Sequence, residues 1–325
     1  VYSTPGQNIS DEQIRSQIEV LNKDYRRTNV DASNTVSEFE KFVTDTRINF
    51  FLTERNESGF ETSGISRTHT THGPFSNDDM KFNEAGGIDA WNPNEFLNIW
   101  VCDLSDGVFG YGTPPGSEKA LDGVVIDFEY FGTLGTVKAP FDQGRTATHE
   151  IGHYFGLDHL WGATGGCSDD DGVGDTPLQA GPSSGCQIDK ASCGSLDMVQ
   201  NFMDLSNDAC MNFFTVGQKD RMRDNIFRNR YTLLTNVVTS FENRNLYSPA
   251  LRTVESSRLE LKLKSKVKSL RIIDFLGRSV PVICTTDDNV TFYIDFTRWR
   301  FPFIVIVAFD ERLETIKIIP GTSMH

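Results

Sequence analysis

The stretch His149-Glu150-Ile-Gly-His153-Tyr-Phe-Gly156-Leu-Asp-His159 is the most informative part of the sequence, and it holds three of the chain's six histidines. On a helix, residues four apart share a face, so His149 and His153 can present their imidazoles to one point. Gly156 permits a backbone conformation that ends the helix, after which His159 can return as a third nitrogen ligand. Three protein nitrogens with one position left open are the arrangement of a catalytic zinc ion.

Glu150 follows the first histidine directly, so its carboxylate can reach a metal-bound water without being a ligand itself. Zinc lowers the pKa of such a water to about 7, and the carboxylate can take the proton as the water attacks. An amphipathic helix with ordinary core histidines does not explain why half of the six histidines fall within eleven residues. A non-catalytic zinc site would gain nothing from the glutamate or from the open position. The pattern therefore predicts a hydrolytic zinc enzyme.

The composition excludes two classes of protein. The 325 residues contain no apolar run near the roughly 20 residues that cross a bilayer, so we expect no membrane span. The net charge is −14, which disfavours nucleic acid as a partner because phosphate binding needs a basic face. The chain begins at Val1 without a signal-like apolar stretch, so we expect that any targeting segment or pro-segment has been removed or lies outside this sequence.

The first 240 residues are expected to mix helices and strands. A capping-box pattern at Ser10–Gln13 precedes apolar residues at helical spacing, which predicts a helix up to about Arg27. Further helices are expected from about Gln143 to Leu157 and from Gly217 to about Arg230, and Gly107–Gly116 is expected as a loop. Short strands are expected at Ile48–Leu52, Ile65–His69, Phe96–Val101 and Val124–Phe128.

The composition changes after about Asn243. Residues 250–325 hold 12 Lys+Arg and 9 Asp+Glu, a net charge of +3, against 19 and 36 in the remainder, a net charge of −17. We therefore expect two domains, residues 1–240 and a small all-β domain at residues 250–325. Its expected strands alternate apolar and polar residues or are continuously apolar: Arg258–Leu263, Ser269–Phe275, Val290–Phe296, Phe303–Phe309 and Thr315–Ile319.

Four of the six cysteines lie within 44 positions, at Cys167, Cys186, Cys193 and Cys210. No C-x-x-C pair occurs, so the spacing favours two disulfides over a zinc site made of thiolates, and it indicates an oxidising compartment. Spacing alone leaves the three possible pairings open. Cys102 stands in an apolar segment and is interpreted as a buried free thiol.

These motifs resemble those of the metzincin metallopeptidases, and specifically of the pappalysin family. The long zinc motif is typical of metzincins, and the resemblance to pappalysins covers roughly residues 1–236. It rests on six further segments: Leu97-Asn-Ile-Trp-Val-Cys102, Gly110-Tyr-Gly112, Asp122-Gly-Val-Val-Ile126, Asp175-Thr-Pro177, Asn201-Phe-Met-Asp204 and Ala209-Cys-Met-Asn-Phe-Phe-Thr215. Astacins and matrixins are a weaker match, because they favour Glu or Ser where this chain has Leu160.

The resemblance implies an α/β metzincin catalytic domain with a mixed twisted sheet, an active-site helix and an irregular C-terminal subdomain. It implies a secreted zinc endopeptidase in which Glu150 is the general base and then the proton donor to the leaving amine. Met203 matches a methionine that lies in a tight turn beneath the zinc site. The family usually has a tyrosine two positions later, whose hydroxyl steadies the tetrahedral intermediate, but this chain has Leu205. Losing one such donor typically costs about 10²–10³ in rate.

The resemblance also implies the disulfides Cys167–Cys193 and Cys186–Cys210. Between these cysteines lies the acidic stretch Asp169-Asp-Asp-Gly-Val-Gly-Asp-Thr-Pro, whose hard oxygen donors suit Ca²⁺, although the spacing is not that of an EF-hand. A solvated acidic turn is the alternative. The resemblance implies a structural calcium ion held by four residues, with Asp171 and Thr176 acting through side chains and Asp169 and Gly174 through carbonyls.

Substrate preference is expected to involve negative charge. The net charge of −17 outside residues 250–325 should attract cationic peptides at low salt. Asp208 lies past the Met203 turn, and in the family this segment lines the pocket for the residue after the scissile bond. The resemblance implies a preference for Arg or Lys there, paired with Asp208. The alternative is that Asp208 merely caps the turn ahead of Cys210.

The C-terminal part, from Ser269-Leu-Arg-Ile-Ile onward, loosely resembles the sorting domains of Bacteroidota type IX secretion, which are small antiparallel sandwiches. This resemblance implies that the C-terminal part engages secretion machinery or attaches the protein at the cell surface. The segment Arg298-Trp-Arg-Phe-Pro stands where such domains usually have a different turn motif. An immunoglobulin-like accessory sandwich is the alternative. With Leu205, this appended domain also motivates a different function class, a zinc-containing binding or adhesion protein with little or no turnover.

Overall fold

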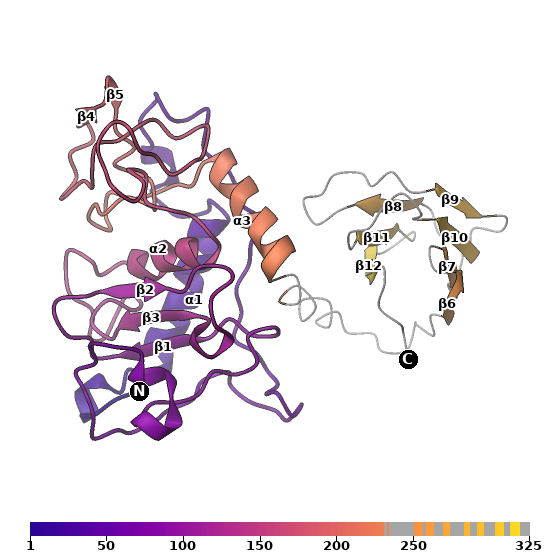
Figure 1. Cartoon of the computed structure of the whole chain (residues 1–325), viewed down its shortest axis with the longest axis horizontal. Coiled ribbons are helices and arrows are strands. Elements are labelled where there is room, and N and C mark those ends of the chain that lie inside the picture. The colour runs from indigo at the N-terminus through magenta and orange to yellow at the C-terminus, as the bar shows by residue number, and fades with distance from the viewer. Residues whose placement is uncertain are drawn as a thin grey trace. The chain divides into compact units, whose positions relative to one another are not determined.

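The computed structural model describes residues 1–230 and 233 and, beyond them, strands between residues 250 and 318. Cα proximity divides the chain into two units, Val1–Leu233 and Leu234–His325. Each unit is described by itself below (Figure 1).

A mixed sheet of three strands forms the centre of the first unit. Its strands are β1 (Ile99–Cys102), β2 (Gly110–Gly112) and β3 (Val124–Asp127), in the order β1-β3-β2. β1 runs parallel to β3 and β2 runs antiparallel to it. All four residues of β3 are buried, as expected for a central apolar strand. β2 therefore lies at the edge of the sheet.

Three α-helices accompany this sheet. α1 (Asp11–Tyr25) begins where the hydroxyl of Ser10 accepts a hydrogen bond from the amide of Gln13. α2 (Arg145–Tyr154) packs along β2 and β3, and α1 packs against α2 (Figure 1). α3 (Val216–Asn229) begins with a capping box at Thr215. The three predicted helices are thus confirmed, with ends shifted by up to three residues. Among the described residues, no helix is both long and apolar enough to span a membrane.

Two of the four strand predictions were wrong. Ile48–Leu52 forms no strand, and in Ile65–His69 only an isolated bridge between His69 and Tyr2 occurs. Among the described residues, neither segment has a neighbouring strand along its length, although Ile48–Leu52 has a strand-like apolar composition. Conversely, β2 lies in the Gly- and Pro-rich stretch that was expected to be a loop. Its glycines are explained by the helix that packs on it, as described below.

The segment from residue 160 to 215 is mostly irregular, with one short hairpin of β4 (Ala191–Ser192) and β5 (Ser195–Leu196). It contains both disulfides that the resemblance implies, Cys167–Cys193 and Cys186–Cys210. Cys102 is a buried free thiol, and burial raises its pKa to about 12. Residues 1–230 also contain five 3₁₀ helices: Pro5–Gln7, Ala32–Asn34, Asp79–Lys81, Asn83–Ala85 and Lys119–Leu121.

The second unit is described as strands of two antiparallel sheets, in the orders β6-β7-β10-β9 and β12-β11-β8. In β10 the side chains of Phe292 and Ile294 are buried. β6 and β9 were not predicted, and Arg298-Trp-Arg-Phe-Pro lies outside the described residues. A sandwich with a sorting or accessory role stays a prediction. The strands are β6 (Ala250–Glu255), β7 (Arg258–Lys262), β8 (Ser269–Ile273), β9 (Ile283–Thr286), β10 (Thr291–Asp295), β11 (Phe303–Ala308) and β12 (Leu313–Ile318).

Arg145, the first residue of α2, connects this helix to three other parts of the first unit. Its buried guanidinium forms ion pairs with Asp24 and Asp31, each at 3.0 Å. It also donates hydrogen bonds to the backbone carbonyls of Asp208 and Met211. Asp24 belongs to α1, so a single side chain holds the start of α2 against α1 and against the segment after Asn207.

We expect Arg145→Met to lower the free energy of unfolding by about 3–5 kcal/mol, because it leaves the carboxylate of Asp24 buried without a cation. Arg26→Met is the control, since Arg26 pairs with Asp45 where both side chains are more than one-third exposed, and such pairs contribute about 0–1 kcal/mol. Urea unfolding followed by circular dichroism measures both. Equal losses would show that Arg145 does not organise the start of α2.

Candidate metal centre and active site

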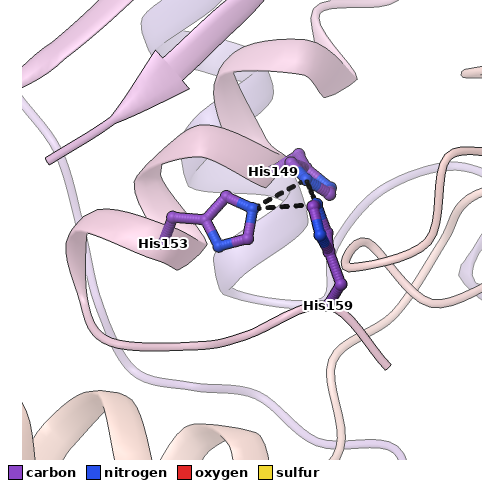
Figure 2. Close-up of side chains that lie close together, drawn as sticks. All are labelled: His149, His153 and His159. Carbon is purple, nitrogen blue, oxygen red and sulfur yellow. Dashed lines mark hydrogen bonds between the residues drawn. The ribbon is translucent and has the colours of Figure 1, made fainter. Parts of the chain in front are cut away.

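Three histidines converge on one point in the first unit. His149 and His153 project from the same face of α2, and His159 reaches them from the chain that follows the helix (Figure 2). The Nε2 atoms of His149 and His153 lie 3.0 Å apart, and each lies 3.2 Å from Nε2 of His159. Gly156, at φ +87°, turns the chain directly after α2, as the sequence predicts.

The protons of the two helical imidazoles are fixed by their neighbours. Nδ1 of His149 lies 2.7 Å from the carbonyl oxygen of Phe202, and Nδ1 of His153 lies 2.7 Å from that of Leu157. A carbonyl only accepts, so Nδ1 carries the proton and Nε2 keeps a lone pair in each neutral ring. Burial lowers the pKa of all three histidines, that of His159 to about 4, which opposes a second ring proton.

Lone pairs that face each other at 3.0 Å repel unless a cation lies between them. A tetrahedral zinc ion with bonds of about 2.0–2.1 Å would place its nitrogen ligands about 3.3 Å apart. The observed separations of 3.0–3.2 Å are close to this value. The donor set therefore fits a zinc ion held by His149, His153 and His159. It is the only such cluster of metal-binding side chains among the described residues.

Glu150 lies between α2 and the edge strand β2. Burial raises its pKa to about 8, and a backbone hydrogen bond from Gly112 acts in the opposite direction. A Cβ at Gly112 would overlap the carbonyl oxygen of Glu150, and one at Gly110 would lie 3.2 Å from its Cγ. The two glycines of β2 thus allow the strand to approach the helix at Glu150. Sequence reasoning missed this role, because a Gly-x-Gly pattern alone indicates only a turn.

Met203 is fully buried directly beneath the histidine-bearing helix. A Cβ at Gly152, between the two helical histidines, would overlap Sδ of Met203. The methionine therefore forms an apolar floor under α2, the place that the resemblance implies for it. Leu205, two residues later, is 44% exposed.

Asp208 is almost completely buried beside the start of α2. Its Oδ2 accepts hydrogen bonds from the amides of Gln143 and Arg145, at 2.8 and 3.1 Å. Within residues 1–230, no hydrogen bond reaches its Oδ1. Burial raises the pKa of this carboxyl to about 6. One oxygen of Asp208 thus caps the start of α2.

The predicted calcium residues lie in one turn, with Asp171 at its centre. Oδ1 of Asp171 accepts hydrogen bonds from the hydroxyl of Thr176, at 2.7 Å, and from the amide of Val173, at 3.0 Å. Its Oδ2 is buried and has no partner, and burial raises the pKa of the carboxyl to about 6. Oγ1 of Thr176 also lies 2.7 Å from the carbonyl oxygen of Val173. An orphaned carboxylate oxygen beside two other oxygens suits a hard cation.

The remaining acidic side chains of this turn have structural partners. The carboxylate of Asp169 accepts bonds from the amide and the hydroxyl of Thr164, so only its carbonyl is left for a ligand role. Asp175 accepts bonds from the hydroxyl of Thr215 and the amide of Gly217, which fixes the turn to the start of α3.

Known proteins resemble this chain across the first unit. Residues 82–227 match the M43 peptidase family, described as pregnancy-associated plasma protein-A. An extracellular metalloprotease of Arthroderma benhamiae is 33% identical over 228 residues, which are 66% of this chain and 65% of the relative. A second one from that organism is 32% identical over 229 residues, 67% of this chain and 72% of the relative. The chain thus spans about two-thirds of the length of these relatives.

Two solved structures of mirolysin also resemble this chain. Mature mirolysin of Tannerella forsythia, in complex with a cleaved peptide, shares 44% sequence identity with this chain at a TM-score of 0.68. The match covers 71% of this chain and 91% of that one. A second mirolysin structure, in complex with a compound, matches with the same identity and TM-score over 72% and 92%.

Proposed function

Because the chain belongs to the pappalysin family of metzincin metallopeptidases, we propose that it is a zinc endopeptidase that acts on protein or peptide substrates outside the cell. The observation that carries this proposal is the convergence of three Nε2 lone pairs, two of them from α2, where Glu150 directly follows His149. The disulfides and the relatives named as extracellular support secretion. Sorting or surface attachment through residues 250–325 stays a prediction.

The proposed mechanism assigns binding and proton transfer to named residues. His149, His153 and His159 hold the zinc ion, with the first two oriented by their hydrogen bonds to backbone carbonyls. A zinc ion bound there would supply Lewis-acid polarisation and would lower the pKa of a water molecule. Glu150 accepts the proton of this water and passes it to the leaving amine.

The substrate is proposed to bind along β2. This strand is at the edge of the sheet and, in the part of the chain that the structure describes, pairs only with β3. Its outer backbone groups can therefore accept an extended peptide as a further strand. The amide of Gly112 points at the carboxylate of Glu150, so the same strand that would align the peptide also contacts the general base. A scissile bond held there lies beside the proton-transferring group.

A binding or adhesion protein with little turnover is the second candidate. Leu205 favours it, since this side chain supplies no hydroxyl for the tetrahedral intermediate and is 44% exposed. Incubation with denatured protein, with and without a chelator, separates the two functions. Chelator-sensitive cleavage supports the peptidase, and intact substrate with zinc-loaded protein supports the binding protein.

We also propose that Ca²⁺ binds in the turn around Asp171 as a structural ion. The buried, unpartnered Oδ2 of Asp171 and the hydroxyl of Thr176 would supply side-chain ligands, with the carbonyls of Asp169 and Gly174 completing the set. The guanidinium of Arg221, in α3, donates to the carbonyls of Asp171 and Gly172, so the ion would stabilise a turn that is already attached to this helix.

The role of Glu150 is tested by Glu150→Gln, which keeps the side-chain shape but cannot accept a proton. We expect peptide cleavage to fall by about 10²–10⁴-fold or more, with zinc content and thermal midpoint unchanged. Glu84→Gln, at an exposed glutamate, is the control. Cleavage is measured with a quenched fluorescent peptide and zinc by atomic absorption. A variant that binds zinc and retains wild-type turnover would refute Glu150 as the base.

The calcium proposal predicts a thermal midpoint that climbs when calcium is added to calcium-depleted, zinc-loaded protein. The stabilisation is RT ln(1 + [L]/Kd), about 2.7 kcal/mol at a hundredfold excess over Kd. Asp171→Asn should flatten this response, whereas Asp170→Asn, at the exposed neighbour, should preserve it. Differential scanning calorimetry provides the midpoints. A wild-type midpoint indifferent to calcium would leave the acidic turn as a solvated loop.

We propose that Asp208 gives a preference for Arg, and then Lys, after the scissile bond. Asp208→Asn keeps an oxygen that can accept the bonds from Gln143 and Arg145 but removes the charge. We expect kcat/KM to fall at least about tenfold more for Arg than for Leu substrates. Asp142→Asn is the control, because it removes one negative charge near Asp208 without changing Asp208 itself. A cleavage profile in which Asp208→Asn retains the Arg preference would limit Asp208 to capping α2.

A further inference from the structure

The three metal-site histidines differ in how their rings are held. His149 and His153 lie on α2, and the Nδ1 of each is hydrogen-bonded to a backbone carbonyl. His159 lies beyond the helix, between the left-handed residues Gly156 and Gly162. Within residues 1–230, its Nδ1 has no hydrogen-bond partner. The orientation of the third ring therefore depends on something other than the hydrogen bonds that orient the first two.

The ring of His159 is instead stacked on an indole. The centroids of His159 and Trp161 lie 4.5 Å apart with an interplanar angle of 14°, the one parallel pairing among the aromatic contacts of the described residues. The amide of Gly162 donates to the carbonyl of His159 at 2.9 Å, so a tight turn brings the two rings together. A Cβ at Gly162 would lie 2.6 Å from the carboxylate carbon of Asp169, which explains why a glycine closes this turn.

We propose that Trp161 is a positioning residue for the metal, whose stacked indole holds the imidazole of His159 with Nε2 directed at those of His149 and His153. The indole covers one face of the ring, so the imidazole cannot rotate about its Cβ–Cγ bond without losing the contact. The indole thereby orients the ring of His159, as a backbone carbonyl orients the ring of each helical histidine. This inference rests on the proposed function in that the three histidines must bind zinc.

The experiment measures zinc release from the full chain with a colorimetric chelator. We expect Trp161→Leu to release zinc about tenfold faster than wild type, the lower end of the effect of losing an outer partner of a metal ligand. Trp161→Phe, which keeps a flat ring, should restore most of the difference. Trp91→Leu is the matched control, since this tryptophan packs edge-on against Phe96 ahead of β1. The Co²⁺-substituted proteins should show altered d–d absorption only for Trp161→Leu.

A second readout does not depend on the folding of the leucine variant. Zinc loading should change tryptophan emission in wild type and in Trp91→Leu, but not in Trp161→Phe. Among the tryptophans that the structure describes, only Trp161 contacts a proposed ligand. Equal zinc release by wild type and Trp161→Leu, or an emission change that persists in Trp161→Phe, would overturn the proposal. Wild-type protein that binds no zinc would instead refute the proposed function itself.

Discussion

The two imidazoles of α2 each commit their only ring proton to a backbone carbonyl, and much of the first unit serves to place those two carbonyls. One belongs to Leu157, in the turn that Gly156 makes possible directly after the helix. The other belongs to Phe202, far along the chain, beside the buried Met203. With both protons committed, the Nε2 lone pairs must face the same point. A metal centre therefore requires that the carbonyl of Phe202 stay within hydrogen-bonding distance of His149 on α2.

The position of that segment is secured from α3. Oδ1 of Asn201 accepts a hydrogen bond from the backbone amide of Met203. The side-chain amides of Asn201 and Gln218 also donate one hydrogen bond to each other. Gln218 is also the residue that completes the capping box at Thr215, so the start of α3 and the turn beneath the zinc site share one buried polar network. Asp175 caps the same helix from the acidic turn. Such a network is rigid when fully satisfied, which suits a site whose ligands cannot shift.

Local signals in the sequence predict the helices and the metal ligands, because capping residues and four-residue spacing act within one or two turns of chain. They do not predict partners that lie far away in sequence. Ile48–Leu52 has the composition of a strand but finds no strand beside it, whereas Gly110–Gly112 has the composition of a loop but pairs with β3. The glycines of β2 are needed because Glu150 lies against them, and that contact spans about forty residues of sequence. Trp161 is likewise interpretable only once its ring is seen on His159.

The resemblance gives Leu205 the place of a tyrosine, and under the proposed function this difference affects how binding energy is used. A tyrosine hydroxyl that contacts the tetrahedral intermediate binds the transition state better than the substrate, so it raises kcat. A leucine offers only apolar contact, which substrate and transition state satisfy almost equally. Its 44% exposure leaves apolar surface that a bound peptide could cover, at about 25 cal/mol per Å² buried. Such uniform binding lowers KM without accelerating the chemical step. Under the proposed function, a leucine in place of that tyrosine therefore favours substrate binding over acceleration of the chemical step.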